Sequence, residues 1–425
     1  MKCGKRFGGA VCVLLLAVVV QGVHAEDSIK IDSLDKLQKI GEDEGYPLDA
    51  HYVLSSDIDA SDLDNFEPIG DSTDPFTGVF DGNGHVITGL TINRPESDYV
   101  GLFGYVGVEG VVRNVTLEDC VVEGGRAVGG LAGRNRGTVL ESDVAGEIMG
   151  DERVGGLVGW NEGDVSDSHH ATGSVTGDEQ VGGLVGWNEH RVISRSSARG
   201  SVTGEMRVGG LVGRNEAGSI SQCYATGDVN GITAVGGLVG HNFSGPASES
   251  YATGSVAGET YVGGLIGVNA GGNAKVTNSY AAGMVEGTQS VGGLVGHNIS
   301  NDSVTASFWD DTLGPSSSAG GEGKSEEEMQ DKSTFTDAGW DFEAIWGIDD
   351  AYPYLLNNPP PMEEEVFGDV TGNGAVDAND VQAVITVVLG LNDEEDYEAA
   401  DVNGDGRVDA LDVQLVILAV LGLLE

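Results

Sequence analysis

The stretch from Val154 to Gln180 reads "VGGLVGWNEGDVSDSHHATGSVTGDEQ", and at Val181 the chain begins again with "VGGLVGWNEH". The same opening recurs along the chain, preceded by a weaker form, "VGLFG". The starts are Val100 for the weak form and Val128, Val154, Val181, Val208, Val235, Val262 and Val291 for the others. Successive starts lie 26 to 29 residues apart. A period this regular is typical of stacked repeats, because each unit buries its apolar face only against a neighbour.

Each repeat is expected to consist of β-strands. It holds several glycines and short β-branched runs, without an amphipathic helical stretch of about ten residues. We expect three short strands per repeat, around "VGGLVG", "GSISQCYA" and "TGDVNG", separated by turns rich in Gly, Asn, Asp and Ser. Such a unit forms one coil of a right-handed parallel β-helix, in which equivalent residues stack about 4.8 Å apart. The predicted fold class is all-β, with this solenoid of about 27-residue coils as its main body.

Two residue types recur in columns that this stacking would create. Asn closes the first strand of each repeat, and three tyrosines share another position. The residues are Asn135, Asn161, Asn188, Asn215, Asn242, Asn269 and Asn298, and Tyr224, Tyr251 and Tyr280. Asn tolerates the left-handed backbone conformation, and stacked amides can hydrogen-bond from coil to coil. We therefore interpret both columns as structural.

Charge composition and the N-terminal sequence restrict the classes of binding partner and the cellular compartment that we expect. The chain has 68 acidic and 21 basic residues and a net charge of −47, which disfavours nucleic acid and anionic lipid and favours divalent cations and neutral ligands. Residues 1–25 read as an export signal, with basic residues, the apolar run "AVCVLLLAVVV" and a small-residue cleavage site ending at Ala25. No later segment is long and apolar enough to predict a membrane-spanning helix. We expect a secreted protein, extracellular or associated with a cell surface.

Two of the four cysteines, Cys120 and Cys223, follow the export signal. They lie four repeats apart, or roughly 19 Å in a stack of parallel strands. A disulfide needs Cα atoms within about 7 Å, so we predict that these two cysteines are free.

The motifs "VGGLVGxN" and "SYATGxVxG" resemble the Glug repeat of secreted bacterial and archaeal surface proteins, several of which are adhesins. The resemblance covers about residues 30–356. It implies an N-terminal cap and first coils over 26–99, the repeat solenoid over 100–307, and a closing segment over 308–356. Because open β-helix ends would template aggregation, we expect a short amphipathic helix within Ser33–Glu44 at one end and the Trp-rich segment Phe308–Leu356 at the other.

If the fold explains the repetition, function should lie where the repeats differ. The position before the recurring Asn holds Arg134, Trp160, Trp187, Arg214, His241, Val268 and His297, and the position after it holds Glu162, Glu189 and Glu216. Exposed Trp and His could stack on sugar rings. Stacked carboxylates about 5 Å apart would repel, and a cation or an Arg could relieve them. The candidate ligand-binding residues are Trp160, Trp187, Arg214, His241, Glu162, Glu189 and Glu216. The alternative is that they are solvated turn residues partnered by Arg134, Arg136, Arg191 or Arg214.

A different kind of module follows the solenoid. Residues 357–366 form a Pro-rich and acidic linker. The segments "DVTGNGAVDAND" at Asp369 and "DVNGDGRVDALD" at Asp401 then place oxygen ligands with the spacing of a 12-residue calcium loop. The first set is Asp369, Thr371, Asn373, the Ala375 carbonyl, Asp377 and Asp380; the second is Asp401, Asn403, Asp405, the Arg407 carbonyl, Asp409 and Asp412. The second loop has four carboxylates against three, so we predict that it binds Ca²⁺ more tightly.

These loop–helix pairs, with no helix entering the loop, resemble a type I dockerin over residues 367–425. The resemblance implies a calcium-dependent α-helical domain that docks onto a cohesin domain of another protein. Loop positions 10 and 11 read Ala378-Asn379 and Ala410-Leu411, where cellulosomal dockerins commonly carry Ser-Thr, so the partner code differs from the cellulosomal one. The apolar faces at Val381, Val384, Ile385 and Val388 and at Val413, Val416, Ile417 and Val420 are expected to form the domain's core and in part to face a partner.

The sequence thus predicts a non-catalytic rod for adhesion or polysaccharide binding, attached through its dockerin. The alternative is a β-helical polysaccharide lyase or glycoside hydrolase carrying the same dockerin, and a third possibility is a structural spacer. An enzyme site should interrupt the repeats with an irregular cluster of acid, base and cation. The best irregular feature is the pair His169-His170, which a turn or a strand end also accommodates.

Overall fold

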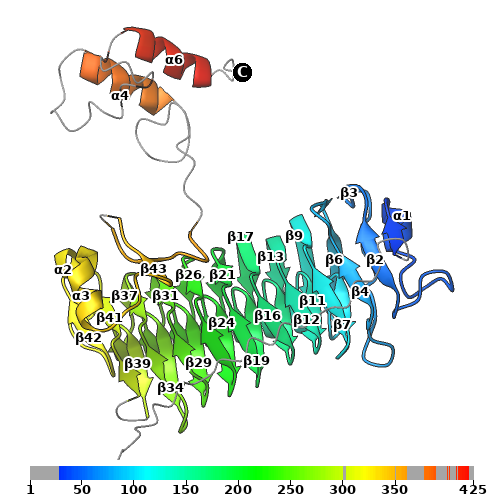
Figure 1. Cartoon of the computed structure of the whole chain (residues 1–425), viewed down its shortest axis with the longest axis horizontal. Helices are drawn as coiled ribbons and strands as arrows, with labels where there is room; N and C mark the ends of the chain where they lie inside the picture. Colours follow the sequence, from blue (N-terminus) through cyan, green and yellow to red (C-terminus); the bar gives the residue numbers. More distant parts are fainter. Residues whose placement is uncertain are drawn as a thin grey trace, which may run out of the picture. The chain divides into compact units, whose positions relative to one another are not determined.

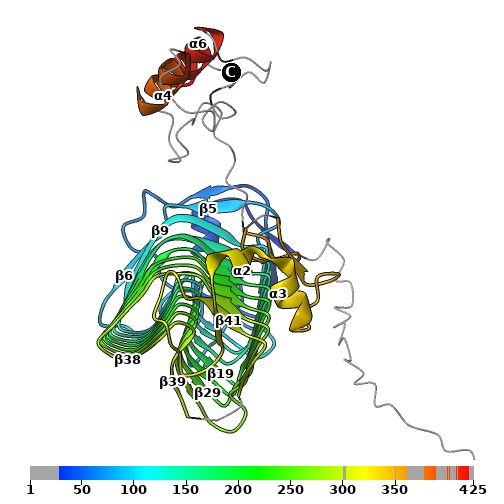
Figure 2. The same ribbon diagram turned by 90° about the vertical axis from the view of Figure 1, so that its left-hand side faces the viewer.

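The computed structural model describes residues 28–299, 303–349, 351–360, 378–388, 400, 402, 408 and 410–420. The chain divides into two compact units, Met1–Asn358 and Pro359–Glu425. In the first unit, strands of successive repeats pair in parallel and form a solenoid, as Figure 1 shows. Viewed end-on in Figure 2, the coils lie nearly one behind another. The predicted parallel β-helix is confirmed.

One coil shows the path of the chain. It runs through β23 (Met206–Gly209), β24 (Val212–Glu216), β25 (Ser219–Ser221), β26 (Tyr224–Ala225) and β27 (Val229–Asn230). The prediction of three strands per coil is therefore wrong. "VGGLVG" does not form one strand, because its central Gly-Leu pair turns the chain between two sheets. A Cβ at Gly210 would overlap the carbonyl oxygen of Gly237 in the next coil, so this corner accepts no side chain.

Equivalent strands of the solenoid form four parallel sheets within the described residues, which we number I to IV along the coil. Sheet I contains β10 (Arg126–Gly129), β14 (Glu152–Gly155), β18 (Glu179–Gly182), β23, β28 (Thr233–Gly236), β33 (Thr260–Gly263) and β38 (Gln289–Gly292). Sheet II contains β7 (Phe103–Val106), β11 (Ala132–Asn135), β15 (Val158–Asn161), β19 (Val185–Glu189), β24, β29 (Val239–Phe243), β34 (Ile266–Ala270) and β39 (Val295–Asn298).

Sheet III runs the length of the solenoid. It contains β1 (Ile29–Ile31), β2 (His51–Leu54), β4 (Val79–Asp81), β8 (Val111–Arg113), β12 (Thr138–Leu140), β16 (Asp164–Ser166), β20 (Val192–Ser194), β25, β30 (Ala247–Ser248), β35 (Val276–Thr277) and β40 (Val304–Thr305).

Sheet IV is the widest, because many coils contribute two segments to it. It contains β3 (Ile58–Asp59), β5 (Val86–Thr88), β6 (Thr91–Arg94), β9 (Thr116–Gly124), β13 (Asp143–Met149), β17 (His169–Thr176), β21 (Ser197–Ala198), β22 (Ser201–Thr203), β26, β27, β31 (Tyr251–Ala252), β32 (Val256–Ala257), β36 (Tyr280–Ala281), β37 (Val285–Glu286), β41 (Phe308–Asp310) and β42 (Glu322–Lys324).

The recurring Asn residues form the predicted ladder inside the solenoid. Asn161 donates from Nδ2 to Oδ1 of Asn188 at 2.9 Å, and Asn188 donates to Asn215 at 2.9 Å. All three are fully buried, so each amide satisfies its neighbour where water cannot. The left-handed backbone conformation falls elsewhere, on residues such as Arg153 (φ 60°) and Arg207 (φ 59°) just before the repeated Val. Left-handed tolerance therefore does not explain the recurring Asn, whereas the hydrogen bonds do.

The N-terminal end is covered as predicted, by a shorter helix. The helix α1 (Leu34–Leu37) has four residues, and turns continue from it to Tyr46. Leu37 and Ile40 are buried in the same core as Ile31, so this segment packs against the first coil.

The C-terminal segment was expected to close the end of the solenoid, but most of it lies along one side. After β42 come α2 (Glu326–Gln330), α3 (Lys332–Asp337), β43 (Trp346–Gly347) and β44 (Tyr354–Leu355). These elements fold back over the outer side of the tyrosine column, whose rings stack 5.0 Å apart. Tyr280 donates from its hydroxyl to the Pro353 carbonyl at 2.6 Å, and Asn358 Nδ2 donates to the Gln222 carbonyl. The segment thus covers a flank of the solenoid as well as extending sheet IV at its end.

The two cysteines are buried and free, as predicted. Burial raises the pKa of each thiol to about 12, so both are inert at neutral pH.

The second unit contains the helices α4 (Ala378–Val388) and α6 (Ala410–Val420), which pack on each other around Val384, Val416 and Ala400. Val384 and Val416 are fully buried, whereas Ile417 and Val388 are each 40% exposed. Among the described side chains, the predicted apolar faces are therefore split between the core and the surface.

Candidate functional site: an arginine–tryptophan ladder and two loop–helix units

The predicted ligand-binding residues that precede the recurring Asn lie in one file on the outer side of sheet II. Arg134, Trp160, Trp187 and Arg214 are register partners in four consecutive coils. We call these four residues the Arg–Trp ladder. Alternation along each strand places the buried Asn and the ladder residue before it on opposite sides.

The faces of the two indole rings are covered by protein groups. Trp160 and Trp187 stack with centroids 5.3 Å apart and planes 3° from parallel. The Arg134 guanidinium lies 3.7 Å from the Trp160 centroid on the one side, and that of Arg214 lies 5.1 Å from Trp187 on the other. Arg153, on β14 of the adjoining sheet I, approaches both rings at 4.5 and 4.6 Å. The geometry therefore offers a ligand the ring edges, and not the faces that stacking on a sugar would need.

Each carboxylate of the predicted glutamate file has a partner in the protein. Glu162 accepts from Arg134 Nε at 2.6 Å, and Glu216 pairs with Arg214 at 2.7 Å. Glu189 accepts from the Trp160 indole N–H at 3.1 Å. Arginine and indole groups thus relieve the expected repulsion. Within the described part of the chain, no group of three or more His, Cys, Asp or Glu residues is arranged to hold a metal ion.

Unpaired polar atoms concentrate at this ladder. Arg153 Nε, Trp187 Nε1, Arg214 Nε and Gln180 Oε1 are buried and lack a hydrogen-bond partner among the described residues. Burial also lowers the pKa of Arg153. An unpaired buried donor costs about 1–3 kcal/mol, so an acceptor added at this place would be stabilised.

A small hollow adjoins the ladder. It has a volume of about 160 Å³ and is lined by Arg136, Glu162, Glu189, His190 and Arg191. Small-molecule sites usually exceed about 300 Å³, so the hollow suits a single polar substituent and not an enclosed sugar ring.

His241 continues the file one coil beyond Arg214. Desolvation lowers its pKa to about 4, with the Arg207 and Arg214 charges acting in the same direction. Its ring is therefore neutral at physiological pH and meets Phe243 edge-on at 6.2 Å. His241 lies in the predicted file but outside the stacked indole pair.

The structure places His169, one of the two histidines singled out in the sequence, beside partners that the sequence did not reveal. Asp143, His169 and Ser197 are register partners in three consecutive coils of sheet IV, and His169 Nδ1 lies 2.8 Å from Ser197 Oγ. Desolvation raises the pKa of Asp143 and lowers that of His169. Acid, imidazole and hydroxyl thus occur in the order of a nucleophilic relay. Ser197 is only 1% exposed, however, so its hydroxyl is not available to a substrate in this conformation. Spacings of 26 and 28 residues between these three side chains could not have been noticed as a motif, because only the stacking of coils creates the file.

His170 occupies the core side of the same strand. It is fully buried, and neither ring nitrogen has a hydrogen-bond partner among the described residues. Its ring lies between Gly156 and Gly200, which leave room for it.

Most of the predicted calcium ligands lie outside the described residues: Asp369, Thr371, Asn373, Ala375, Asp377, Asp401, Asn403, Asp405, Arg407 and Asp409. The last ligand of each loop is described: Asp380 lies in the first turn of α4, and Asp412 in the first turn of α6. Asp412 is fully buried. A helix N-terminus favours a carboxylate, and both acids precede the buried Val384 and Val416 by four residues. Both helices therefore carry an Asp in the first turn and a buried Val four residues later, at an interval of 32 residues.

No helix in the described parts of the chain is long and apolar enough to cross a membrane.

Comparisons with protein families identify two parts of the chain. The family model of the GLUG motif matches residues 204–230, and that of the dockerin type I domain matches residues 367–421. The chain therefore contains a Glug motif and a C-terminal type I dockerin, as the sequence predicts.

Two curated relatives share part of the repeat pattern. Halomucin of Haloquadratum walsbyi is 40% identical over 150 residues, which cover 33% of this chain and 2% of that protein. A protein of Evansella cellulosilytica, provisionally named a Gly-rich membrane protein, is 45% identical over 104 residues, or 23% of this chain and 12% of that protein. The chain thus spans only a small fraction of the length of the curated relatives it matches.

Two solved structures superpose on part of this chain. A protein of Bacteroides ovatus, provisionally assigned as an immunoglobulin A1 protease, superposes with a TM-score of 0.46 and 20% identity over 79% of this chain and 94% of its own. A second structure, named IgA1 protease, has a TM-score of 0.41 and 16% identity over 63% of this chain and 22% of its own.

Proposed function

We propose that this chain, which carries a Glug motif and a type I dockerin domain, is a secreted, non-catalytic rod for adhesion or polysaccharide binding. Its dockerin, loaded with calcium, attaches it to a cohesin-bearing partner. The observation that supports this proposal is the pairing of a regular solenoid with a dockerin in one chain. Dockerins bind cohesin domains, so the module supplies attachment while the solenoid presents a surface.

Calcium is proposed as the only cofactor, in two sites. The ligands of the first are Asp369, Thr371, Asn373, the Ala375 carbonyl, Asp377 and Asp380, and those of the second are Asp401, Asn403, Asp405, the Arg407 carbonyl, Asp409 and Asp412. All are oxygen donors at the spacing of a calcium loop, with Gly374 and Gly406 at the sharp turn. Asp412 is buried in the first turn of α6, at the position of the last ligand of the second loop.

The non-catalytic part of the proposal rests on accessibility. The one acid–imidazole–hydroxyl file found among the described residues has its hydroxyl at Ser197, which is 1% exposed. A nucleophile must reach a substrate carbonyl or phosphorus, and this one is covered. We interpret the file as part of the solenoid's internal polar structure.

Polysaccharide binding is assigned to the edge of the Arg–Trp ladder. Half-buried indole edges, arginines that pair with Glu162 and Glu216, and the hollow of about 160 Å³ lie together there. A polysaccharide could place hydroxyl groups against these charged groups without inserting a ring. The expected affinity is modest, because the ring faces remain occupied by Arg134 and Arg214.

Attachment is tested by capture on a panel of immobilised recombinant cohesin domains, using the chain from residue 26 onwards. We expect capture in calcium, loss of capture in EDTA, and recovery when calcium is returned. Asp412→Ala should weaken capture, whereas Asp228→Ala, on an exposed turn of the solenoid, should not. Capture that is indifferent to EDTA would contradict calcium-dependent docking.

The role of the solenoid is tested on a polysaccharide microarray, with the same preparation assayed for release of reducing ends and unsaturated sugars. Binding without release, reduced about tenfold by Trp187→Ala and unchanged by Met206→Ala, would support the proposal. Met206 is an exposed residue of sheet I and serves as the matched surface control. Sugar release would favour the enzyme, and no binding to any polysaccharide would favour a spacer.

A further inference from the structure

The sheets of the solenoid do not all end in the same way at its C-terminal end. Sheets III and IV continue into β40, β41 and β42. The edge of β39 is covered, since Gly293 donates to the Ser317 carbonyl at 3.1 Å and Ala319 to that of Val295 at 2.9 Å. Within the described residues, β38 has no further neighbour in sheet I, and β37 has none beyond β32. Two adjoining strands therefore present an open edge.

The backbone donors of this edge are unused. In the preceding coils, Val229 donates its N–H to the Ser255 carbonyl and Val256 to that of Met284, both at 2.8 Å. Gly258 likewise donates to the Glu286 carbonyl at 3.0 Å. The corresponding N–H groups of the last coil belong to Val285 and Gly287, and neither has a backbone acceptor among the described residues. Residues 286–290 are exposed, so the edge is open to another strand.

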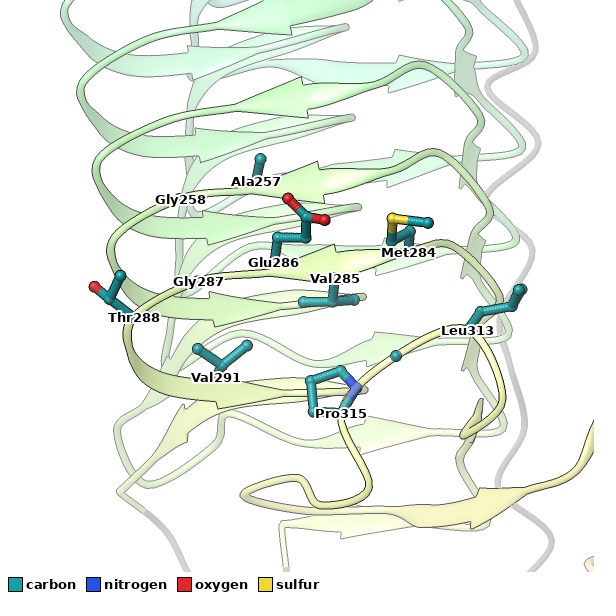
Figure 3. A pocket seen from close by; sticks show the side chains of 11 residues that line it. Ala257, Gly258, Met284, Val285, Glu286, Gly287, Thr288, Val291, Leu313 and Pro315 are labelled. Carbon is teal, nitrogen blue, oxygen red and sulfur yellow. The ribbon is translucent and has the colours of Figure 1, made fainter.

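A hollow of about 860 Å³ lies over the same edge. Figure 3 shows Met284, Val285 and Glu286 on β37 and its approach, with Leu313 and Pro315 on the loop that crosses below. Met284 is 52% exposed and Leu313 is 42% exposed. The hollow therefore combines free ladder donors with apolar side chains on both sides and one carboxylate, that of Glu286.

We propose that this edge binds an extended segment of a partner protein as an additional strand, with apolar side chains packed on Met284 and Leu313 and a basic residue beside Glu286. Strand addition takes its affinity from main-chain hydrogen bonds and its selectivity from alternate side chains, and both elements are present here. This interaction is separate from the dockerin and from the Arg–Trp ladder.

Charge identifies the partner as basic. Glu286 is the charged residue of the hollow, and the chain as a whole carries −47. A second copy would bring Glu286 against Glu286 and one strongly acidic body against another, which is repulsive. A strand that carries lysine or arginine instead forms an ion pair with Glu286 and is attracted by the net negative charge of the chain.

The test is fluorescence anisotropy with the chain from residue 26 onwards and a labelled hexapeptide of alternating lysine and valine. An acidic protein attracts any basic peptide, so the deciding reagent is the same peptide N-methylated at alternate residues. It keeps its charge but cannot form the ladder. We expect N-methylation to weaken binding about tenfold or more.

Two protein variants locate the site. Met284→Lys places a positive charge, which repels the lysines of the peptide, on the proposed apolar contact. Asn230→Lys places the same charge on the exposed face of β27, two coils from the edge. Both positions are exposed, so both variants should fold. We expect Met284→Lys to weaken the peptide about tenfold and Asn230→Lys to leave it within about twofold. Equal binding of the N-methylated peptide, or equal loss in both variants, would show surface adsorption and overturn the proposal. A dimer in sedimentation that Met284→Lys abolishes would overturn the choice of occupant.

Discussion

His170 is expected to make the solenoid sensitive to acid. Its ring is fully buried at a file that holds Val144 in the coil before and Ala198 in the coil after. Desolvation lowers its pKa from 6.5 to about 4, and the nearby Arg199 charge acts in the same direction, while the Gly146 carbonyl opposes them. The protonated ring is therefore tolerated in the unfolded chain and not in the fold.

The sign and size of the effect follow from the two pKa values. Above pH 6.5 the ring is neutral in both states and contributes no pH dependence. As the pH falls from 6.5 to about 4, the unfolded chain takes up a proton that the folded chain does not, and stability falls. Below pH 4 both states are protonated and the loss is complete. A shift from 6.5 to about 4 corresponds to about 3 kcal/mol in the free energy of unfolding.

The assay is urea denaturation followed by circular dichroism at pH 7 and pH 4, for the wild type and His170→Val. Valine is the residue that the preceding coil carries at this file. The substitution itself leaves a smaller side chain, so absolute stabilities are not compared. The informative quantity is the decrease in the free energy of unfolding between pH 7 and pH 4, compared between the two proteins. Carboxylates that titrate in the same range are common to both and cancel in the difference.

We expect the wild type to lose about 3 kcal/mol more than His170→Val between pH 7 and pH 4. His190→Ala removes an exposed histidine and should retain the wild-type dependence. Parallel losses in the wild type and His170→Val, within about 1 kcal/mol, would refute the reasoning that a buried, unpaired imidazole controls acid stability.

Three further predictions concern the ladder, the cap and the calcium loops. Asn188→Ala should cost about 2–4 kcal/mol in urea denaturation, because it leaves buried partners unpaired on both sides, whereas Asn298→Ala at the partly exposed end of the ladder should cost less. Tyr280→Phe removes the buried hydrogen bond to Pro353 and should destabilise the cap by about 1–2 kcal/mol, detected as faster limited proteolysis after residue 340; an unchanged rate would show that the aromatic contacts suffice. Calorimetric titration of the chelator-treated chain should show two calcium sites, and Asp412→Ala should remove the tighter one; loss of the weaker site would reverse our ranking of the loops.

The sequence was sufficient to predict the stacking and its internal ladder. A regular period fixes which residues become neighbours in successive coils, and Asn188 therefore had to meet Asn161 and Asn215. The number of strands per coil was not predictable in the same way. The turn at Gly210 depends on a close approach to the carbonyl of Gly237 in another coil, and "VGGLVG" also fits a continuous apolar strand.

The ligand-binding prediction had a similar limit. Periodicity placed Trp160 and Trp187 in one file, which the structure shows, and suggested that their faces were open. Periodicity does not predict which side chains of an adjoining file cover the indole rings. Arg153 covers both rings from a left-handed backbone position on β14, and no spacing in the sequence pairs it with either indole. Contacts between files depend on how the coil folds back on itself, whereas contacts within a file depend on the period alone.

This distinction indicates where a stacked protein can bind partners through its backbone. Inside the stack, each donor is satisfied by the next coil, as Val256 is by Met284, so repeated positions have no free ladder groups to offer. Only the strands at the two ends of a sheet retain them, and there the cap decides whether they stay available. In this chain the C-terminal segment returns along the tyrosine column and covers β39, while β37 and β38 stay open within the described residues. The position of the cap, and not the repeat itself, therefore determines where a partner strand can join.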